Sequence, residues 1–448
     1  MKCLIIGGDA AGMSAASQIR RRQPDWSITV VEKGRFTSYA ACGIPYAIAG
    51  DVESASDLEV FPAEKFRSER NIDVRVQCEA LSVDTEAREV RVRGEGGEEV
   101  LSWDRLLIAT GAIPIVPPWP GIDLEGVAVV RNLEDLARLE HLLTHDAPTR
   151  AVVVGAGYVG LEMAEALHRR GLAVTVLEKA DGVMGGLDPK ITALVREEMG
   201  SRCALRLETT VTGFEGEGGR LRAVTTDGGR FEADIAIVAL GVRPNVALAR
   251  DAGIAIGPTG AIAVDAHQRT SAPDVWAAGD CAESLHRVLG APAFIPLALG
   301  ANRAGRVAGV NMGGGESVFP GVVGSAVTRV CELAVARTGV TEAAALSAGI
   351  PATSVSATAS DRAHYITGHQ PVWIKLVFRS DDRRLIGALL AGRDRALGKR
   401  CDVLATAITA GMTVDEVADL DLTYAPPFAP VWDPILKAAT RAVFTRKD

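Results

Sequence analysis

One pattern occurs twice along this chain of 448 residues, and it constrains the fold more than any other feature. Each copy has a short apolar strand, a glycine-rich turn, a helix of small residues and a second apolar strand that ends in Glu-Lys; the copies span residues 3–33 and 151–179. In a βαβ unit that binds a dinucleotide, the glycines permit a tight turn, close approach of the backbone to a pyrophosphate, and packing of the helix on the strand. The final acid accepts hydrogen bonds from a ribose diol, and it follows the first glycine by 25 residues in one copy (7 to 32) and by 23 in the other (155 to 178).

Two such units in one chain predict two dinucleotide cofactors that face each other, most simply FAD at the first unit and NAD(P)H at the second. Asp9 stands where the middle glycine of the first copy is expected, so Gly8 is predicted to provide the close approach. Glu178 is predicted to favour NADH because a carboxylate repels the 2′-phosphate of NADPH, although the neighbouring Lys179 keeps NADPH as an alternative. The candidate cofactor-binding residues are Gly7, Gly8, Ala10, Ala11, Gly12, Glu32 and Lys33 in the first copy, and Gly155, Gly157, Tyr158, Val159, Gly160, Glu162, Glu178 and Lys179 in the second.

Further apolar strands complete an α/β architecture with two Rossmann-like folds. The segments 106–111, 236–245 and 275–280 each lead from a strand into a turn of small residues. The last one delivers Asp280 to the carboxyl end of a sheet, where open α/β sheets bind their ligands. The predicted organisation is a discontinuous FAD-binding domain over 1–112 and 246–318, an NAD(P)H-binding domain over 113–245, and a separate C-terminal α+β domain over 319–448.

Charge and cysteine content argue against several other classes of protein. Lys and Arg total 48 against 56 Asp and Glu, and the net charge of −8 makes a nucleic-acid partner unexpected. No apolar run approaches the roughly 20 residues of a membrane helix, and the N-terminus enters a glycine turn too early for a secretory signal. We therefore expect a cytoplasmic protein with no membrane partner and no metal site, in which the seven cysteines are thiols.

Over essentially its whole length, the sequence resembles the flavoprotein disulfide reductases that contain two dinucleotide-binding domains. The resemblance rests on the two glycine turns with their acids and on the small-residue turns at 109–111 and 279–280. Members of the glutathione-reductase type carry a Cys-x4-Cys pair after the second strand, whereas this chain has the single Cys42 in the frame Ser-aromatic-x-x-Cys-Gly (38–43). That frame resembles the single-cysteine branch: coenzyme A-disulfide reductases, persulfide reductases, and NADH oxidases and peroxidases. The further cofactor contacts that the resemblance implies are Ala80, Ala109, Thr110, Gly111, Gly241, Gly279, Asp280, Pro296, Leu297 and Ala298.

Two features favour the reductases within this branch. NADH oxidases and peroxidases carry a histidine in the first glycine turn, where this chain has Ala10, and no histidine precedes residue 141. The segment 424–428 and the region around Tyr365 resemble the coenzyme A-disulfide reductases. The resemblance also implies that the C-terminal unit is a dimerisation domain and that the protein is a homodimer with shared active sites.

Cys42 is the candidate catalytic residue, because a disulfide reductase needs a thiolate that attacks sulfur and then accepts electrons from reduced flavin. The following Gly-Ile-Pro is predicted to open a helix, whose N-terminus would lower the pKa of the thiol from about 8.5 toward neutrality. The departing thiolate needs a proton donor, and the final 79 residues (370 to 448) contain no histidine. The resemblance implies that Tyr365 and Tyr424 take this role, reaching in from the partner subunit.

Coenzyme A requires basic and polar contacts. Ser14, Gln18 and Arg21 have the spacing i, i+4, i+7 and therefore share one face of the first predicted helix. Two departures from the coenzyme A-disulfide reductases, Ala41 in place of asparagine and Trp432 in place of lysine, keep another disulfide or a persulfide as alternative substrates. The candidate substrate-binding residues are Ser14, Gln18, Arg21, Arg22, Ser38 and Arg70.

The leading prediction is therefore a homodimeric FAD enzyme that uses NAD(P)H to reduce coenzyme A disulfide or a persulfide. The first alternative is an NADH oxidase or peroxidase that reduces O2 or H2O2. Two further alternatives are a flavoprotein that passes electrons to a protein such as a ferredoxin, and a redox-sensing binding module with negligible turnover. The electron-transfer flavoprotein would not require Cys42 to be reactive.

Overall fold

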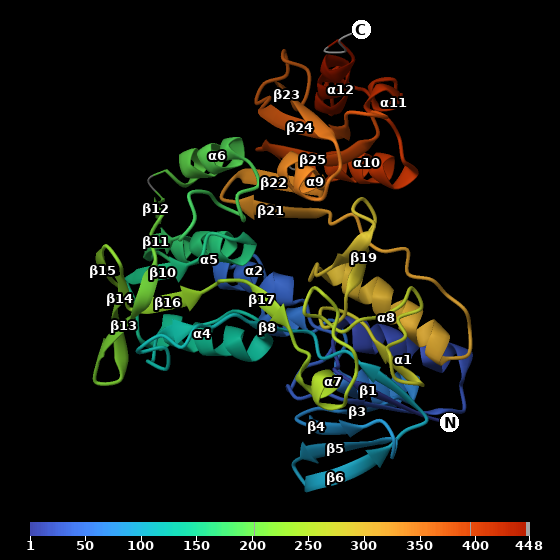
Figure 1. The fold of residues 1–448 in the computed structure, drawn as a ribbon. Coiled ribbons are helices and arrows are strands. Elements are labelled where there is room, and N and C mark those ends of the chain that lie inside the picture. Colours follow the sequence, from blue (N-terminus) through green and yellow to red (C-terminus); the bar gives the residue numbers. More distant parts are fainter. Residues whose placement is uncertain (201, 395, 445–448) are drawn as a thin grey trace.

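The computed structural model describes residues 1–200, 202–394 and 396–444, and the described chain contains three large sheets (Figure 1). Two of them are five-stranded and parallel, and their strand orders, β18-β7-β1-β2-β3 and β9-β16-β10-β11-β12, match position by position. The prediction of two Rossmann-like folds is confirmed. The strands are β1 (Lys2–Ile6), β2 (Ser27–Val31), β3 (Asp73–Arg75), β7 (Arg105–Ile108) and β18 (Val275–Ala277) in the first sheet, and β9 (Val127–Ala128), β10 (Arg150–Val154), β11 (Ala173–Leu177), β12 (Cys203–Arg206) and β16 (Ile235–Val238) in the second.

Small residues bring the helices of the first fold into close contact. Helix α1 (Ala10–Arg22) follows the first glycine turn and packs against α8 (Ala298–Met312). A Cβ on Gly305 or Gly309 of α8 would lie within 2.4 Å of a backbone oxygen of α1, so only glycine permits this approach. The corresponding helix of the second fold is α5 (Tyr158–Arg169).

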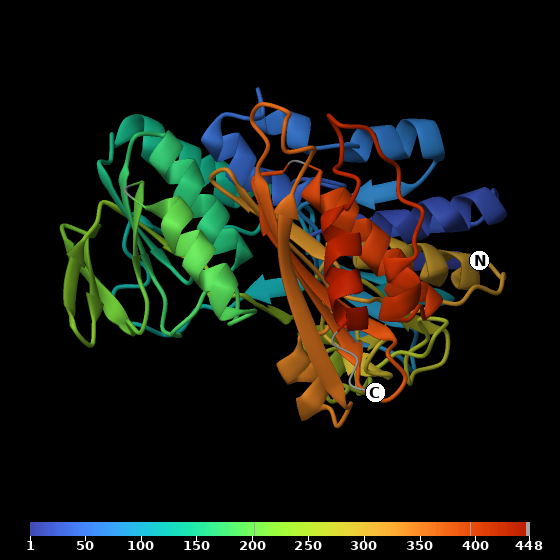
Figure 2. The ribbon, with the colours of Figure 1, turned by 90° about the horizontal axis from the view of Figure 1, so that it is seen from above.

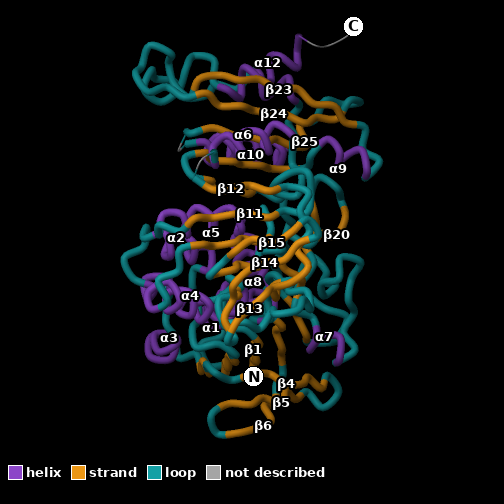
Figure 3. The backbone as a smooth tube through the Cα atoms, turned by 90° about the vertical axis from the view of Figure 1, so that its left-hand side faces the viewer, coloured by secondary structure: helices purple, strands orange, loops and turns teal. Residues whose placement is uncertain are grey.

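Short elements surround the two parallel sheets. The chain passes from the first fold to the second through β8 (Ala112–Pro114) and returns through β17 (Val242–Pro244), which pairs with β8. Each fold also carries a small antiparallel sheet, and the one formed by β4–β6 lies at the end of the molecule opposite the C-terminal sheet (Figure 3). The remaining elements of this part are β4 (Glu79–Asp84), β5 (Glu89–Gly94), β6 (Gly97–Ser102), β13 (Val211–Glu217), β14 (Arg220–Thr226), β15 (Gly229–Glu232), β19 (Ser284–His286), β20 (Ala291–Ala293), α3 (Ala63–Arg70), α4 (Leu133–His145), α6 (Pro189–Met199) and α7 (Ala247–Asp251).

The C-terminal unit is a five-stranded antiparallel sheet with the order β21-β22-β25-β24-β23, so its predicted α+β character is confirmed. Seen from above, this sheet crosses the junction between the two parallel folds (Figure 2). In the described part of the chain, no helix is long and apolar enough to span a bilayer. The unit comprises β21 (Ala326–Val330), β22 (Leu333–Gly339), α9 (Glu342–Ser347), β23 (Ala352–Ser360), β24 (Pro371–Arg379), β25 (Leu385–Gly392), α10 (Leu397–Ala410), α11 (Val414–Ala418) and α12 (Pro434–Phe444).

Helix α2 (Ile44–Ala49) is packed where all three units meet. Its residues Ile44 and Ile48 are fully buried in one apolar cluster with Leu161 of α5 and Leu389 of β25. The helix begins with proline near its N-terminus and ends at Gly50, whose left-handed backbone (φ 81°) closes the last turn. This packing fixes the loop that precedes α2, which contains Cys42.

Candidate active site

The two glycine turns have the same backbone geometry. Gly7 and Gly155 have φ values of 112° and 106°, and a Cβ on either would lie 2.1 or 2.5 Å from the carbonyl oxygen of a neighbouring strand end. The third glycines, Gly12 and Gly160, leave only 1.9 and 2.0 Å between such a Cβ and the carbonyl oxygen of the first glycine. Asp9 is the N-cap of α1, as Gly157 is of α5, so the acid occupies the position of the middle glycine without disturbing the turn.

The glutamates that follow β2 and β11, Glu32 and Glu178, make matching hydrogen bonds in the two folds. Glu32 accepts hydrogen bonds from the backbone N–H groups of Gly8 (2.7 Å) and Gly34 (2.6 Å). Glu178 accepts them from the N–H groups of Ala156 (2.8 Å) and Ala180 (2.9 Å). Each carboxylate is therefore held at the mouth of its glycine turn, with further lone pairs able to accept hydrogen bonds from a diol.

A cavity of about 690 Å³ opens beside the first turn. Most of the residues predicted there line it, whereas Gly12 packs beneath the turn and Pro296–Ala298 lead into α8. Burial raises the pKa of Asp9 in its wall to about 6, and Arg131 opposes this rise. The predicted residues that line the cavity are Gly7, Gly8, Ala10, Ala11, Glu32, Lys33, Ala80, Ala109, Thr110, Gly111, Gly279 and Asp280, and those that sequence reasoning missed include Asp9, Tyr39, Arg131, Asp135 and Asn245.

The segment just before Cys42 borders both this cavity and a groove that is lined by residues of α1. Ser38, whose backbone is left-handed (φ 48°), lines the groove, and the next residue, Tyr39, lines the cavity. Cys42 follows in a single 3₁₀ turn, and a Cβ on Gly43 would lie 2.4 Å from the side chain of Leu58, so a larger residue after the cysteine would have to displace Leu58. Of the seven cysteines, all free thiols, Cys42 is exposed and the other six are buried.

The surroundings of Cys42 raise the pKa of its thiol, contrary to the expectation of a lowered pKa. Although the residue reaches the surface, the protein removes much of the water around its sulfur, and this burial raises the pKa of the thiol. Glu162 raises it further, as do Asp280 and Asp9, while Arg131 lowers it. The expectation considered only the N-terminus of α2, a helix of six residues, and included neither the burial of the sulfur, which is the largest cause of the raised pKa, nor these carboxylates.

Glu162 connects the three units next to Cys42. Its Oε1 accepts hydrogen bonds from Tyr46 Oη of α2 (3.2 Å) and from Thr328 Oγ1 of β21 (2.7 Å). Burial raises the pKa of Glu162, and these two hydrogen bonds counteract the rise. Glu162 in turn contributes, after burial, to raising the pKa of Tyr46 to about 12.

The groove has a volume of about 430 Å³ and gathers five of the six predicted substrate-binding residues: Ser14, Gln18, Arg21, Ser38 and Arg70. Arg70 lies 4.3 Å from the ring centroid of Phe61, and its Nη1 donates to Ser17 Oγ at 2.8 Å. The sixth, Arg22, is not part of the groove, because its side chain turns toward Gly313 and Gly315 at the end of α8.

Helix α8 supplies the groove residues that sequence reasoning missed: Asn302, Arg303 and Arg306. Asn302 accepts a hydrogen bond from Ser14 Oγ at 2.8 Å. Within the described ranges, no carboxylate forms an ion pair with Arg21, Arg303 or Arg306. The groove is therefore a cationic surface suited to an anionic ligand.

The second turn carries the remaining predicted residues. Tyr158 begins α5 with its side chain half-buried against the C-terminal sheet, and its hydroxyl has no hydrogen-bond partner among the described residues. Val159 is exposed, and a Cβ on Gly157 or Gly241 would meet open space, so this side of the turn is accessible. Lys179 is exposed beside Glu178.

Tyr365 and Tyr424 lie together at the surface of the C-terminal unit. They are 64% and 50% exposed, and a hydrogen bond to Tyr424 raises the pKa of Tyr365. The C-terminal unit lies at the top of Figure 1, and α2 packs against the lower side of its sheet. The structure thus brings the two tyrosines together, but on a different unit from Cys42.

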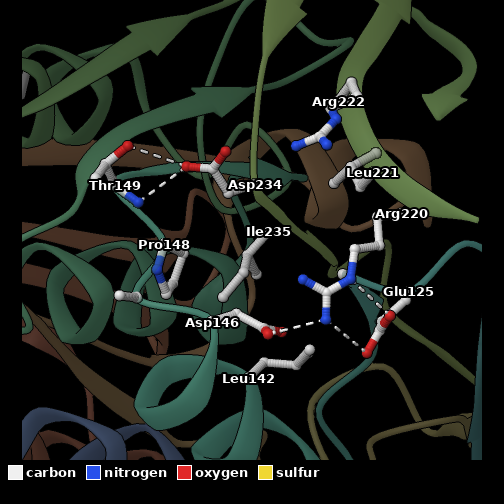
Figure 4. A pocket seen from close by; sticks show the side chains of 12 residues that line it. Glu125, Leu142, Asp146, Pro148, Thr149, Arg220, Leu221, Arg222, Asp234 and Ile235 are labelled. Atoms are coloured by element: carbon white, nitrogen blue, oxygen red, sulfur yellow. Dashed lines mark hydrogen bonds and ion pairs between the residues drawn. The ribbon is translucent and has the colours of Figure 1, made fainter. Parts of the chain in front are cut away.

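A smaller cavity of about 200 Å³ lies between α4 and β14, away from these residues (Figure 4). Several of its charges are paired within its own wall: Arg220 contacts Asp146 at 2.9 Å and Glu125 at 3.1 Å. Asp234 likewise accepts hydrogen bonds from the backbone N–H and hydroxyl of Thr149. None of the predicted site residues lines this cavity.

Comparison with protein families agrees with this geometry. The family model described as "Pyridine nucleotide-disulphide oxidoreductase" matches residues 1–301, and the one for the dimerisation domain of the same proteins matches residues 325–434. The chain belongs to the pyridine nucleotide-disulphide oxidoreductase family.

Several members of this family are similar over the whole chain. The NAD(P)H coenzyme A polysulfide/persulfide reductase of Pyrococcus horikoshii is 39% identical over 439 residues, which cover 98% of this chain and 97% of the relative. An NADH oxidase of Methanocaldococcus jannaschii is 36% identical over 450 residues, covering 99% of both chains. The structure of an NAD-dependent persulfide reductase from A. fulgidus superposes with a TM-score of 0.96 at 39% identity, over 100% of this chain and 83% of that one.

FAD is the cofactor of the family, and the first fold fits it. The close approaches of Gly7 and Gly12 leave the N-terminus of α1 facing the cavity, where backbone N–H groups favour phosphate. Glu32 stands at the end of β2 to accept hydrogen bonds from a ribose, and Lys33 and Arg131 add positive charge to the wall.

Proposed function

We propose that the chain is an FAD-dependent NAD(P)H oxidoreductase that reduces coenzyme A disulfide, or a persulfide of coenzyme A or another small thiol, through Cys42. One observation carries this proposal: the exposed Cys42 follows a segment that borders both the groove (Ser38) and the cavity (Tyr39), and charges in the cavity wall, Arg131, Asp280 and Asp9, act on its thiol. A thiol in that position can meet a sulfur substrate from one side and a redox cofactor from the other.

The reaction needs one reactive sulfur. Cys42 as thiolate attacks the substrate RS–SR′, forms Cys42–S–SR and releases R′S⁻, which takes up a proton. Two electrons from NAD(P)H then cleave the mixed disulfide, so that a second thiol leaves and Cys42 returns to the thiolate. When bound, the flavin supplies the transfer of this electron pair from nicotinamide to sulfur. The balance is NAD(P)H + H⁺ + RSSR′ giving NAD(P)⁺ + RSH + R′SH.

The groove supports coenzyme A as the thiol carrier. Its arginines can form charge-assisted hydrogen bonds with the phosphates of coenzyme A, and Phe61 offers an apolar surface. Ser14, Gln18 and Ser38 supply polar contacts along the same wall. We assign substrate binding to this surface.

NADH is the proposed reductant at the second fold. Both oxygens of Glu178 are oriented by backbone N–H groups, which places the carboxylate to accept hydrogen bonds from a ribose 2′-hydroxyl and to repel a 2′-phosphate. Tyr158 and Glu162, one turn apart on α5, flank the proposed nicotinamide site.

The active enzyme is proposed to be a homodimer in which Tyr365 and Tyr424 of one subunit serve Cys42 of the other. Their exposure and mutual hydrogen bond support this role, because a pair of hydroxyls can donate to a departing sulfur. The free state of the six buried cysteines supports a reducing compartment, the cytoplasm.

A second candidate function is the reduction of O2 or H2O2, which the similarity to an NADH oxidase supports. Ala10 argues against it, because the first turn carries no histidine to act on an oxygen substrate.

Anaerobic NADH consumption distinguishes the two functions. The FAD-loaded protein is offered coenzyme A disulfide and, separately, coenzyme A persulfide, with Cys42→Ser as the control. We expect rapid turnover that the Cys42→Ser variant loses, and the faster substrate identifies the enzyme. NADH loss that occurs only in air would reject the reductase and leave the oxidase, and full turnover of Cys42→Ser would indicate electron transfer without a reactive cysteine.

A further inference from the structure

A buried cluster of charges lies beneath the two loops that carry Tyr365 and Tyr424. Arg400, in the first turn of α10, is only 8% exposed. The three aspartates around it, Asp361, Asp394 and Asp433, are 2%, 8% and 6% exposed. Burying a guanidinium is costly unless its N–H groups find partners, so the identity of those partners indicates what the cluster does.

Arg400 binds both tyrosine loops at once. Its Nη2 donates to the carbonyl oxygen of Asp361 at 2.8 Å and makes a longer contact of 3.5 Å to the carbonyl oxygen of Phe428. Asp361 precedes Tyr365 by four residues (361 to 365), and Phe428 follows Tyr424 by four (424 to 428). The same planar group therefore holds one loop just before its tyrosine and the other just after.

The carboxylates fix the guanidinium in that orientation. Nε donates to Asp433 Oδ2 at 2.9 Å, and Nη1 pairs with Asp394. The other oxygen of Asp433 accepts from the N–H of Ile435 (2.9 Å) in α12, and that of Asp394 accepts from the N–H of Ala396 (2.9 Å) ahead of α10. Arg400 is thus anchored to two helices and presents its remaining donors to the loops.

The loops are also joined to each other. The N–H of Ala363 donates to the carbonyl oxygen of Pro426 at 3.0 Å, and Tyr365 hydrogen bonds with Tyr424. Asp361 closes the base of its own loop, because its carboxylate accepts from the N–H of Gln370 at 2.8 Å. Among the residues that the structure describes, Arg400 is the only side chain that hydrogen bonds to the backbones of both loops.

We propose that Arg400 is a positioning residue that holds Tyr365 and Tyr424 as a pair in the geometry needed at the active site of the partner subunit. This inference rests on the proposed function, in which the two hydroxyls donate to the departing sulfur. Lysine cannot replace this arginine, because a single ammonium does not reproduce the planar fork that reaches two carboxylates and two carbonyls together. A small displacement of a proton donor is enough to reduce its contribution to catalysis.

The test uses the FAD-loaded full-length protein with Arg400→Lys and the matched control Arg383→Lys. Arg383 lies in the same unit and binds Asp415 at 2.6 and 2.8 Å and the carbonyl oxygen of Ala442 at 3.2 Å, but it contacts neither tyrosine loop. Two quantities are measured for each variant: the titration of Tyr365 by NMR of tyrosine labelled with ¹³C at Cζ, and kcat with the disulfide or persulfide substrate. The Tyr365→Phe variant assigns the resonance.

We expect Arg400→Lys to return the pKa of Tyr365 to that of an ordinary exposed tyrosine and to lower kcat about tenfold, while Arg383→Lys leaves both unchanged. In a Tyr365→Phe/Tyr424→Phe background, Arg400→Lys should lower kcat by less than about twofold, because it acts through the tyrosines. If Arg400→Lys does not yield the FAD-loaded protein, Asp433→Asn, which keeps the acceptor for Ile435 but weakens the hold on Arg400, is measured in the same way.

The outcomes separate this inference from the proposed function. A folded Arg400→Lys protein that keeps the raised pKa of Tyr365 and normal kcat would overturn the positioning role. An equal loss of kcat with and without the tyrosines would also overturn it. If the pKa of Tyr365 falls in Arg400→Lys but Tyr365→Phe/Tyr424→Phe keeps full kcat, Arg400 positions the pair and the proton-donor part of the proposed function is wrong.

Discussion

At the scale of single residues, the reactivity of Cys42 depends on charges that are distant in the sequence. Glu162 and Asp280 reach the thiol from α5 and from the end of β18, and both raise its pKa, while Arg131 opposes them. The local motif around residue 42 identifies the candidate cysteine but contains none of these charges. The position of the thiol could therefore be predicted from the sequence, whereas the direction of its pKa shift could not.

Neutralising Glu162 should make Cys42 a stronger nucleophile at neutral pH. The Glu162→Gln variant removes a negative charge that penalises the thiolate, so the pKa of Cys42 falls and its thiolate fraction at a given pH rises. The rate of alkylation by iodoacetamide, measured against pH, should show its midpoint at lower pH than in the wild type. Glu165→Gln, three residues further along α5, serves as the control; an unshifted profile in Glu162→Gln would contradict the prediction.

Glu178 and Glu32 form a matched pair for testing cofactor choice. Glu178→Gln keeps an acceptor but removes the charge that repels a 2′-phosphate, so the ratio of kcat/KM for NADH to that for NADPH should fall at least about tenfold, or about 1.4 kcal/mol. Glu32→Gln, at the same place in the first fold, should weaken FAD retention and leave this ratio unchanged. Steady-state kinetics with both nucleotides decide the question, and an unchanged ratio in Glu178→Gln would count against the assignment.

At the scale of elements, sequence reasoning succeeded where the determinants are local. A glycine turn, its helix and the acid that follows lie within one βαβ unit, and the geometry of Gly7 and Gly155 follows from that pattern. The groove required more, because α1 and α8 are separated by more than 270 residues (22 to 298) and meet only through tertiary packing. Arg303 and Arg306 carry no motif, and helical spacing alone could not show that Arg22 turns toward Gly313 and Gly315.

Arg306, in the middle of α8, and Arg22, at the end of α1, can therefore be compared directly. Arg306→Ala removes a cation from the groove and should raise KM for coenzyme A disulfide about tenfold with kcat nearly unchanged, because the proposed role of the groove is to bind a part of the substrate that does not react. Arg22→Ala should leave KM unchanged, since Arg22 does not line the groove. With a disulfide that has no phosphates, such as 2-hydroxyethyl disulfide, we expect both variants to have the same KM. If Arg306→Ala raised KM equally for both substrates, Arg306 would have a structural role and not a role in binding phosphate.

The buried carboxylate of Glu198 links the second fold to the C-terminal unit through ion pairs and hydrogen bonds. Glu198 of α6 is 5% exposed; it pairs with Arg393 (2.6 Å) and Arg202 (2.8 Å) and accepts from the N–H of Glu332 (3.1 Å). Glu198→Gln removes the charge that pairs with Arg393 and Arg202, which are themselves about half exposed, and should lower the free energy of unfolding by about 1 kcal/mol at pH 7, measured by urea denaturation. The exposed neighbour Glu197→Gln is the control.

The same pairing gives a pH dependence with a defined sign. Burial raises the pKa of Glu198, but the hydrogen bonds from Arg393, Glu332 and Arg202 outweigh it, so the folded-state pKa is lowered. The stabilisation is thus present above the unfolded-state pKa of about 4.3 and is lost as the pH falls through the lower folded-state pKa. The difference between wild type and Glu198→Gln should therefore shrink in acid, and a difference that grew in acid would contradict the assignment.

At the scale of the whole molecule, one chain does not bring all the proposed catalytic groups together. Cys42 lies at the junction of the parallel folds, whereas Tyr365 and Tyr424 lie on the C-terminal unit, next to the exposed side chains of Phe428 (80%) and Trp432 (61%). Large apolar side chains that are this exposed indicate a surface that contacts another protein molecule. Because residues 325–434 match the dimerisation domain of the family, a second copy of the chain is the expected occupant of that surface.

Mixed dimers test whether the two halves of the site come from different subunits. In a dimer of one Cys42→Ser subunit and one Tyr365→Phe/Tyr424→Phe subunit, shared sites leave one active site intact, formed by Cys42 of the second subunit and the tyrosines of the first. The other site carries both defects.

The hybrid is obtained by co-expressing differently tagged subunits and purifying the dimer that carries both tags. It should show about half the turnover of the wild-type dimer, although each parental homodimer is impaired. If cysteine and tyrosines acted within one subunit, the hybrid would have no intact site and its activity would not exceed the mean of the two parents. A hybrid of wild-type and Cys42→Ser subunits, which retains one intact site under either arrangement, calibrates the activity of a single site.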